Sequence, residues 1–111
     1  MANKSQPPKY VYICGVRWSI TYHKEDVVYE NNMLQGLTDR ANRTIKIDAK
    51  LPLDGVKSTL LHEVIHAIIS TTLNTYPDEE EPLVQAMEVG WCSVINDPRN
   101  NSFLSYIFNH L

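Results

Sequence analysis

Two histidines and a glutamate lie close enough in the sequence to bind a metal ion and to use it. His62 and His66 are four residues apart, and Glu63 follows the first of them, in the pattern His-Glu-x-x-His. On a helix, side chains four residues apart lie one turn apart on the same face, so both imidazoles can reach one ion. Zinc accepts imidazole nitrogen and prefers tetrahedral surroundings. The spacing therefore predicts a zinc site that includes His62 and His66.

Glu63 has a different position relative to the ion. Because each residue of a helix turns by about 100°, the carboxylate of Glu63 is expected beside the metal rather than on it. A carboxylate placed there can accept a proton from water held by the ion. The motif thus predicts a zinc-dependent hydrolase in which Glu63 is the general base.

A catalytic zinc site needs a third protein ligand and a fourth position open to water. No third histidine follows at the spacing of the longer HExxHxxGxxH pattern. The candidates are acidic residues of the next predicted helix, namely Glu79, Glu80, Glu81 and Glu88. Glu80 shares a helical row with the apolar Met87 and Trp91, whereas Glu81 points more to the side, and the spacing leaves the choice open. Tyr76, in the loop before this helix, is a candidate donor to a developing oxyanion.

The elements that must position these residues are strands followed by helices. Apolar residues recur at helical spacing from Val56 to Thr72, with Asp54 as the predicted N-cap, so the motif lies on a largely buried helix. Further helices are predicted from Asp78 and from Asn101. Four extended segments precede them, at Tyr10–Tyr22, Val27–Tyr29, Met33–Leu37 and Thr44–Asp48. This order predicts an α+β fold with a small antiparallel sheet, in which the alternating segment Thr44–Asp48 is an edge strand.

Length and composition limit the other possibilities. A chain of 111 residues with 43% apolar and 21% charged residues predicts one folded domain, over residues 10–111, after a flexible tail at residues 1–9. With 10 Lys and Arg against 13 Asp and Glu, the net charge of -3 argues against a nucleic-acid or membrane partner. The sequence lacks an apolar run of membrane-spanning length and a signal-peptide pattern, so we expect a cytoplasmic protein with Cys14 and Cys92 as buried free thiols.

The segment Thr59-Leu60-Leu61-His62-Glu63-Val64-Ile65-His66-Ala67-Ile68, followed by a glutamate-rich helix start, resembles the small HExxH zincin-like proteins often encoded by phages and prophages. These proteins are similar to the minimal gluzincin peptidases and, more distantly, to the metallopeptidase domain of the ImmA/IrrE type. The resemblance extends from about Tyr12 to Asp97, and it includes the strand Ile45–Asp48 before the helix.

The resemblance implies a zincin-like fold, a bound Zn²⁺ and hydrolysis of a peptide bond in a peptide or protein substrate. In that family the third ligand is a glutamate at the start of the second helix, three residues before a small or β-branched residue. Glu81 matches, because Val84 follows it by three. The family tends to place an aspartate four residues after this ligand to orient a histidine, and here the position is Gln85.

Two hypotheses for a metal-binding function remain, beside a third in which the protein is structural and binds no metal. In the first, an extended substrate adds to the expected edge at Ile45–Asp48 and is hydrolysed. In the second, the same zincin scaffold holds the metal and binds a partner protein without hydrolysing it. The chain is short and leaves little room for a substrate-binding subdomain, which favours a narrow substrate or this second reading.

Overall fold

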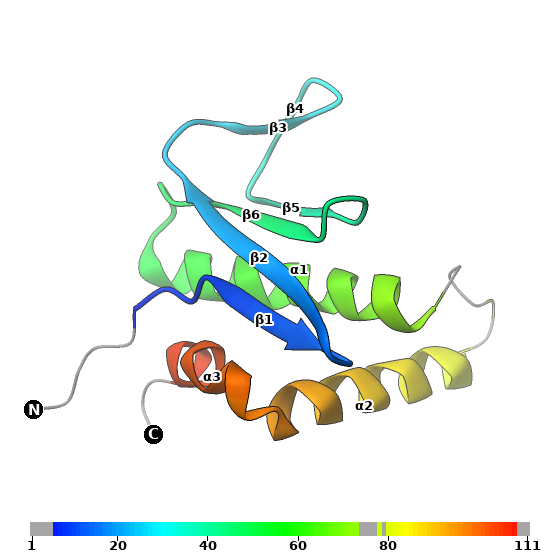
Figure 1. The fold of residues 1–111 in the computed structure, drawn as a ribbon. Coiled ribbons are helices and arrows are strands. Elements are labelled where there is room, and N and C mark those ends of the chain that lie inside the picture. The colour runs from blue at the N-terminus through cyan, green and yellow to red at the C-terminus, as the bar shows by residue number, and fades with distance from the viewer. Residues whose placement is uncertain (1–5, 74–77, 79, 109–111) are drawn as a thin grey trace, which may run out of the picture.

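A four-stranded sheet, three helices and a projecting two-stranded hairpin make up the computed structural model, which describes residues 6–73, 78 and 80–108 (Figure 1). The expected α+β class is confirmed. The elements in chain order are β1 (Tyr10–Ile13), β2 (Val16–His23), β3 (Val27–Tyr29), β4 (Asn32–Leu34), β5 (Gly36–Asp39), β6 (Thr44–Asp48), α1 (Leu53–Thr72), α2 (Glu80–Asn96), a 3₁₀ turn (Pro98–Asn100) and α3 (Asn101–Ile107).

The sheet is mixed, with the strand order β1-β2-β6-β5. β2 and β6 are parallel, whereas β1 pairs with β2 and β5 pairs with β6 in antiparallel fashion. The prediction of a purely antiparallel sheet is therefore wrong. After β2 the chain passes through the hairpin β3–β4 and the strand β5, and it returns as β6 in the direction of β2. β6 thus lies between β2 and β5, so its prediction as an edge strand is also wrong, and β5 forms that edge.

A tight turn divides the predicted long strand Tyr10–Tyr22 into β1 and β2. Cys14 and Gly15 form this turn with φ values of 50° and 79°, the pair of positive angles that matches the twist of a two-residue hairpin. The turn exposes Cys14, and Cys92 lies exposed on α2. Both cysteines are free, as predicted, but the prediction that they are buried is wrong.

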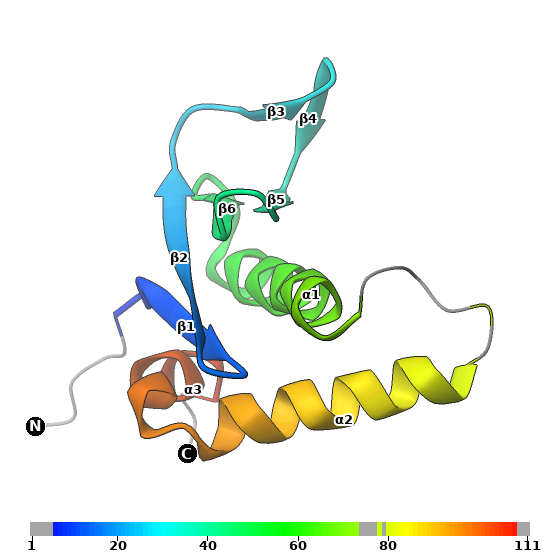
Figure 2. The same cartoon turned by 45° about the vertical axis from the view of Figure 1, so that its right-hand side comes forward.

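The core lies between one face of the sheet and α1. Alternate residues of the strands point to this face and are buried: Val11, Ile13, Trp18, Ile20, Ile45 and Ile47. They meet the buried side of α1, formed by Leu60, Val64, Ala67 and Ile68. Figure 2 shows α1 along this face, with the hairpin β3–β4 standing out above it. The helix begins two residues earlier than predicted, with Pro52 rather than Asp54 at the N-cap.

The helix α2 runs antiparallel to α1 and touches it closely at one glycine (Figure 1). A Cβ atom added to Gly90 would collide with the Cγ2 methyl of Ile68. Glycine therefore sets how near the two helices approach. This contact also fixes which residues of α2 lie opposite the middle of α1.

The buried side chain of Asn100 closes the outer edge of β1. Its Oδ1 accepts a hydrogen bond of 2.7 Å from the backbone N–H of Tyr12, and its Nδ2 donates to the Tyr12 carbonyl at 2.8 Å and to the Val94 carbonyl at 3.0 Å. An amide side chain thus takes the place of a neighbouring strand. Such pairing protects an edge from adding a further strand.

Pro8 and Lys9 form hydrogen bonds with β2. Pro8 is buried and its carbonyl accepts a hydrogen bond of 2.9 Å from the Tyr22 hydroxyl, while the Lys9 carbonyl accepts one of 2.8 Å from the Ile20 N–H. Residues 1–5 of the predicted tail lie outside the described residues. None of the helices in the described ranges combines the length and the apolar character needed to cross a membrane.

The contact at Gly90 generates a stability prediction. Gly90→Ala should lower the free energy of unfolding by about 1–3 kcal/mol, because the new methyl overpacks the interface with Ile68. Urea unfolding measures this change, with Val89→Ala at an exposed position of the same helix as the control. Combining Gly90→Ala with Ile68→Leu, which removes the Cγ2 methyl, should cost less than the sum of the two single changes. Equal stability of Gly90→Ala and the wild type would contradict the described packing.

Candidate metal centre

His62 and His66 lie together on the side of α1 that faces away from the core. Both side chains are exposed, and their Nε2 atoms are 3.2 Å apart. The ring centroids are 4.9 Å apart, with the ring planes inclined by 71°. The buried residues Leu60 and Val64 hold the opposite side of the helix against the sheet. Core packing thus fixes the rotation of α1 that presents the two imidazoles.

The separation of the two nitrogens fits a shared zinc ion. Two ligands bound at about 2.0–2.1 Å with a tetrahedral angle between them lie about 3.3 Å from each other. The observed 3.2 Å is close to this value. A neutral imidazole offers one free lone pair, which is the donor that zinc requires. Without zinc, the Nε2 atoms of His62 and His66 can form an N–H···N hydrogen bond when one of them carries the proton.

Glu63 is buried beside this exposed pair, with 6% of its surface accessible. The Thr38 hydroxyl lies 2.7 Å from Oε1 of Glu63 and 3.0 Å from its backbone oxygen, within donating distance of both. The other carboxylate oxygen, Oε2, lies 4.0 Å from Nε2 of His62. The carboxylate therefore has one oxygen held by Thr38 and the other directed toward the histidines.

A glycine of β5 makes this arrangement possible. A Cβ atom added to Gly36 would lie 2.7 Å from Cγ2 of Thr59 and 2.9 Å from Cγ of Glu63. Any side chain at this position would therefore push β5 away from α1. Gly36 and Thr38 were not predicted as part of the site. The strand β6 and more than two turns of α1 separate them from the motif, so no local spacing connects them with it.

A groove of about 520 Å³ runs beside these residues, between β4–β5 and α1. Its lining residues are Met33, Leu34, Gln35, Gly36, Ser58, Thr59, His62 and Glu63. The Asp48 N–H donates to the Gln35 carbonyl at 2.8 Å. Since antiparallel strands alternate between bonded and outward residues, the backbone groups of Gly36 and Thr38 point away from β6, toward the free edge. The groove thus combines an open strand edge with His62 and Glu63.

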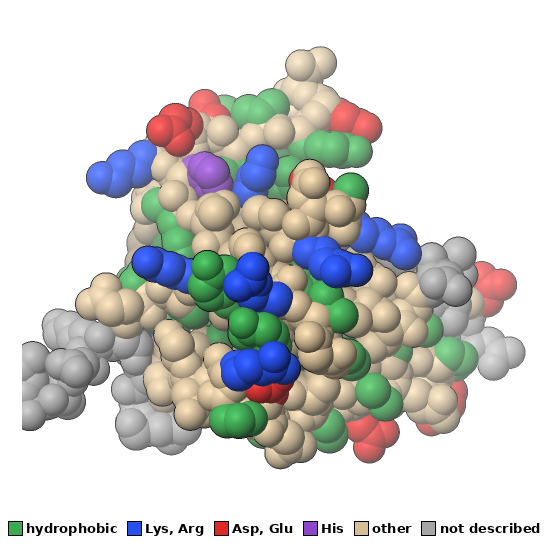
Figure 3. Space-filling view, in the orientation of Figure 1, with side chains coloured by type: hydrophobic (Ala, Val, Ile, Leu, Met, Phe, Trp, Pro, Cys, Tyr) green, Lys and Arg blue, Asp and Glu red, His purple; other side chains and the backbone are tan. Residues whose placement is uncertain are grey.

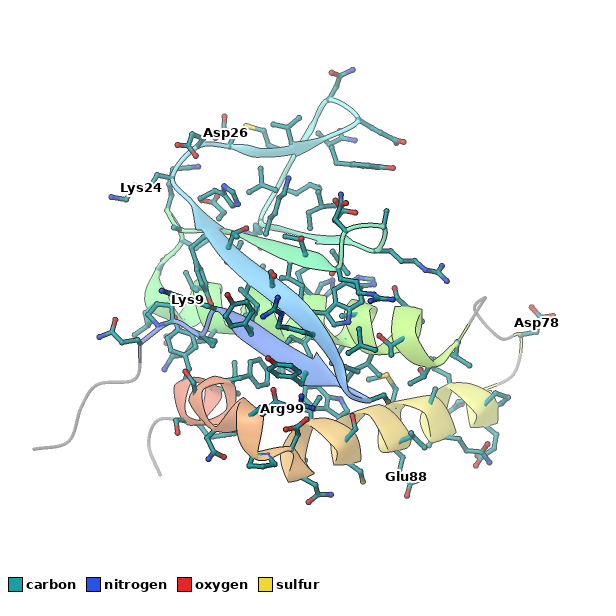
Figure 4. All side chains as sticks on the ribbon, viewed as in Figure 1. Lys9, Lys24, Asp26, Asp78, Glu88 and Arg99 are labelled. Carbon is teal, nitrogen blue, oxygen red and sulfur yellow. The ribbon has the colours of Figure 1, made fainter. Side chains whose placement is uncertain are left out.

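The predicted third ligand is not gathered with the histidines. Glu80 and Glu81 are exposed in the first turn of α2, and Glu88 points away from α1 (Figure 4). Within residues 6–73, 78 and 80–108, no three His, Cys, Asp or Glu side chains come together as a metal-binding group. Glu79 and Tyr76 lie outside the described residues. Glu81 stays a prediction.

The packing of the two helices explains this separation. Gly90 of α2 lies against Ile68 of α1, and the helices are antiparallel (Figure 2). Glu81 precedes Gly90 by more than two turns, about 13 Å along the axis, toward the C-terminal end of α1. His66 lies on the other side of Ile68, toward the N-terminal end of α1. Glu81 and His66 therefore lie on opposite sides of the contact between Gly90 and Ile68, and they are far apart along the helices.

The contact between Thr38 and Glu63 generates a prediction that needs no substrate. Thr38→Val keeps the shape of the side chain but leaves a buried carboxylate oxygen without this donor, which should lower the free energy of unfolding by about 1–3 kcal/mol. Thr38→Ser retains a hydroxyl and should lower the free energy of unfolding by less than Thr38→Val does. Both variants should bind zinc as the wild type does, because neither changes an imidazole. Urea unfolding and zinc titration test this, and a Thr38→Val protein as stable as the wild type would refute the role.

Comparisons of the chain with protein-family models, with curated proteins and with solved structures found no match. The case for a metal centre therefore rests on the side chains themselves. Those are the paired imidazoles of His62 and His66, and the buried carboxylate of Glu63 beside an open groove.

Proposed function

We propose that the protein is a zinc-dependent hydrolase of peptide bonds with a zincin-like arrangement of its site. The observation that carries this proposal is the 3.2 Å separation of the His62 and His66 Nε2 atoms, next to the buried carboxylate of Glu63. A helix that bears this motif beside a free strand edge supports the zincin-like assignment. The groove along that edge suits an extended peptide.

His62 and His66 would hold the zinc ion through Nε2, with Glu81 as the third ligand. When bound there, zinc supplies a Lewis acid that polarises a carbonyl and makes water more acidic. Glu63 accepts the proton of the attacking water and passes it to the leaving amine. Because Thr38 occupies Oε1, the proton moves through Oε2, the oxygen nearer His62. The carboxylate is thus oriented before a substrate arrives.

Strand addition orients the substrate in this proposal. An extended peptide pairs with the outward backbone groups of Gly36 and Thr38, which replaces the predicted use of Ile45–Asp48. Those residues form the central strand β6 and have no free edge. The absence of a side chain at Gly36 lets β5 itself lie close to Glu63, so a peptide that pairs with β5 comes near the carboxylate. The scissile carbonyl then lies between the edge of β5 and the histidine pair.

The third ligand generates the next prediction. Glu81 and the histidines lie on opposite sides of the Gly90 contact, so zinc binding through Glu81 requires the N-terminal part of α2 to move along α1 toward His66. Glu81→Ala should weaken zinc affinity at least tenfold, since it removes both a ligand and a charge that offsets the cation, whereas Glu88→Ala should leave the affinity unchanged. Competition with a chelating dye measures both. Equal affinities of Glu81→Ala and the wild type would exclude Glu81, and Glu80→Ala would then be the next variant.

A second function has a specific observation in its favour. The groove and the free edge of β5 are complete without the metal. Among the described residues, no third ligand lies beside the two histidines. A protein with this arrangement can bind an extended segment of a partner and leave it intact. In that case zinc stabilises the fold and Glu63 is not a base.

Glu63→Gln separates the two functions. The amide keeps the shape of the side chain and can still bond with Thr38, but it cannot accept the proton, so cleavage should fall by about 10²–10⁴ while zinc binding stays near wild type. His62→Ala should lose both zinc and cleavage. A mixed peptide library, with products read by mass spectrometry, supplies the substrate. Cleavage by Glu63→Gln at the wild-type rate would contradict the proposed base.

A further inference from the structure

The net charge of the chain hides an uneven distribution of charged residues. The face of the sheet opposite the helices carries the alternate residues of its strands: Tyr10, Tyr12, Arg17, Ser19, Thr21, His23, Leu37, Asp39, Thr44, Lys46 and Asp48. We call these residues, with Lys9 and Arg99 beside them, the open face. Figure 3 shows Lys and Arg side chains spread over this side of the molecule, with acidic side chains gathered toward its ends.

Three cations of the open face lie outside the salt bridges of the described residues, although hydrogen bonds from Asn42 and, to a smaller extent, the charge of one of these cations, Lys46, lower the pKa of the nearby Asp39. Lys9, Arg17 and Lys46 form no ion pair with any residue of the described ranges. The acidic residues nearby already have partners. Asp48 pairs with Lys50 at 3.2 Å and Asp97 pairs with Arg99 at 2.7 Å. Hydrogen bonds from Asn42 hold the pKa of Asp39 below its usual range, so this carboxylate is charged and also engaged.

Aromatic rings lie among these cations. The Arg17 guanidinium lies 4.8 Å from the centre of the Tyr10 ring, and that of Arg99 lies 4.1 Å from the centre of the Tyr12 ring. Both oxygens of Asp97 bind Arg99, at 3.0 Å and 2.7 Å, so its position is fixed. Tyr10 is 44% exposed, which leaves much of its ring accessible to a ligand.

A hollow of about 390 Å³ lies beside these groups, bordered by Gln6, Pro7, Lys9, Tyr10, Tyr12, Arg99 and Ser102. Figure 4 shows Lys9 at the start of β1 and Arg99 below this strand. The volume exceeds that of a nucleobase, and the border offers an aromatic face, a hydroxyl and cations. Base stacking on aromatic rings and phosphate contacts with cations are the two interactions that bind single-stranded nucleic acids.

We propose that the open face binds single-stranded nucleic acid, with a base stacked on Tyr10 in the hollow and phosphates bound by Lys9, Arg17 and Lys46. The surface lies on the opposite side of the sheet from α1 and does not depend on the proposed zinc site. An acidic peptide would satisfy the cations but would leave the aromatic ring without a stacking partner. The local charge thus overrides the expectation from the net charge that nucleic acid is not a partner.

Fluorescence anisotropy with a labelled oligothymidylate of about 12 nucleotides, in the presence of EDTA, tests the proposal. The wild type should bind with a micromolar Kd that weakens as salt rises from about 50 to 200 mM. The triple variant Lys9→Ala, Arg17→Ala, Lys46→Ala should bind at least tenfold more weakly and with a smaller salt dependence. Lys57→Ala, a cation on α1 beside Tyr106, is the matched control and should bind as the wild type does.

A pair of variants at Tyr10 tests the stacking. Tyr10→Phe keeps the aromatic ring and should bind the oligonucleotide like the wild type. Tyr10→Leu keeps an apolar side chain without a ring, and its affinity should fall about fivefold or more. Thermal melting confirms that each variant is folded. Absence of binding at about 100 µM protein in low salt would overturn the proposal. The proposal would also be overturned if a polyglutamate peptide competed as well as the oligonucleotide and the Tyr10→Leu variant bound the oligonucleotide like the wild type. The open face would then bind acidic protein.

Discussion

The burial of the Glu63 carboxylate between α1 and β5 is the constraint on which the site depends. A buried carboxylate is costly unless it has a hydrogen-bond donor, and the Thr38 hydroxyl provides one at 2.7 Å. Thr38 can reach it because β5 lies close against the helix, and β5 lies there because Gly36 has no side chain. The same close approach places the free edge of β5 beside His62. One contact between strand and helix therefore orients the carboxylate and forms the groove.

The topology of the sheet determines which edge is available. β6 inserts between β2 and β5, so β5 becomes the outer strand on the side of the groove. At the other end, Asn100 pairs with the backbone of Tyr12 and covers the edge of β1. The edge of β5 is therefore the one left open for the extended peptide of the proposed function. The two edges differ because a single buried amide occupies one of them.

The features that could be predicted from the sequence are those that depend on local spacing. The helix from Val56 to Thr72, the placement of both imidazoles on one of its faces and the α+β order follow from local patterns. The exposure of that face was not predicted, because the helix was expected to be largely buried. The parallel pairing of β2 with β6 could not be predicted, since it joins segments separated by a whole hairpin. Thr38 and Gly36 could not be predicted as partners of Glu63 for the same reason. The fit of Glu81 depends on the register between α1 and α2, which a contact at Gly90 sets.

X-ray absorption at the zinc K-edge tests the central claim most directly, because it reports the atoms bound to the ion in the zinc-loaded full chain. The account predicts nitrogen or oxygen ligands at about 2.0–2.1 Å with the scattering pattern of two imidazoles. His66→Ala should remove one of the two imidazole contributions. A first shell of oxygen atoms alone, unchanged in His66→Ala, would show that zinc binds elsewhere and would contradict the account.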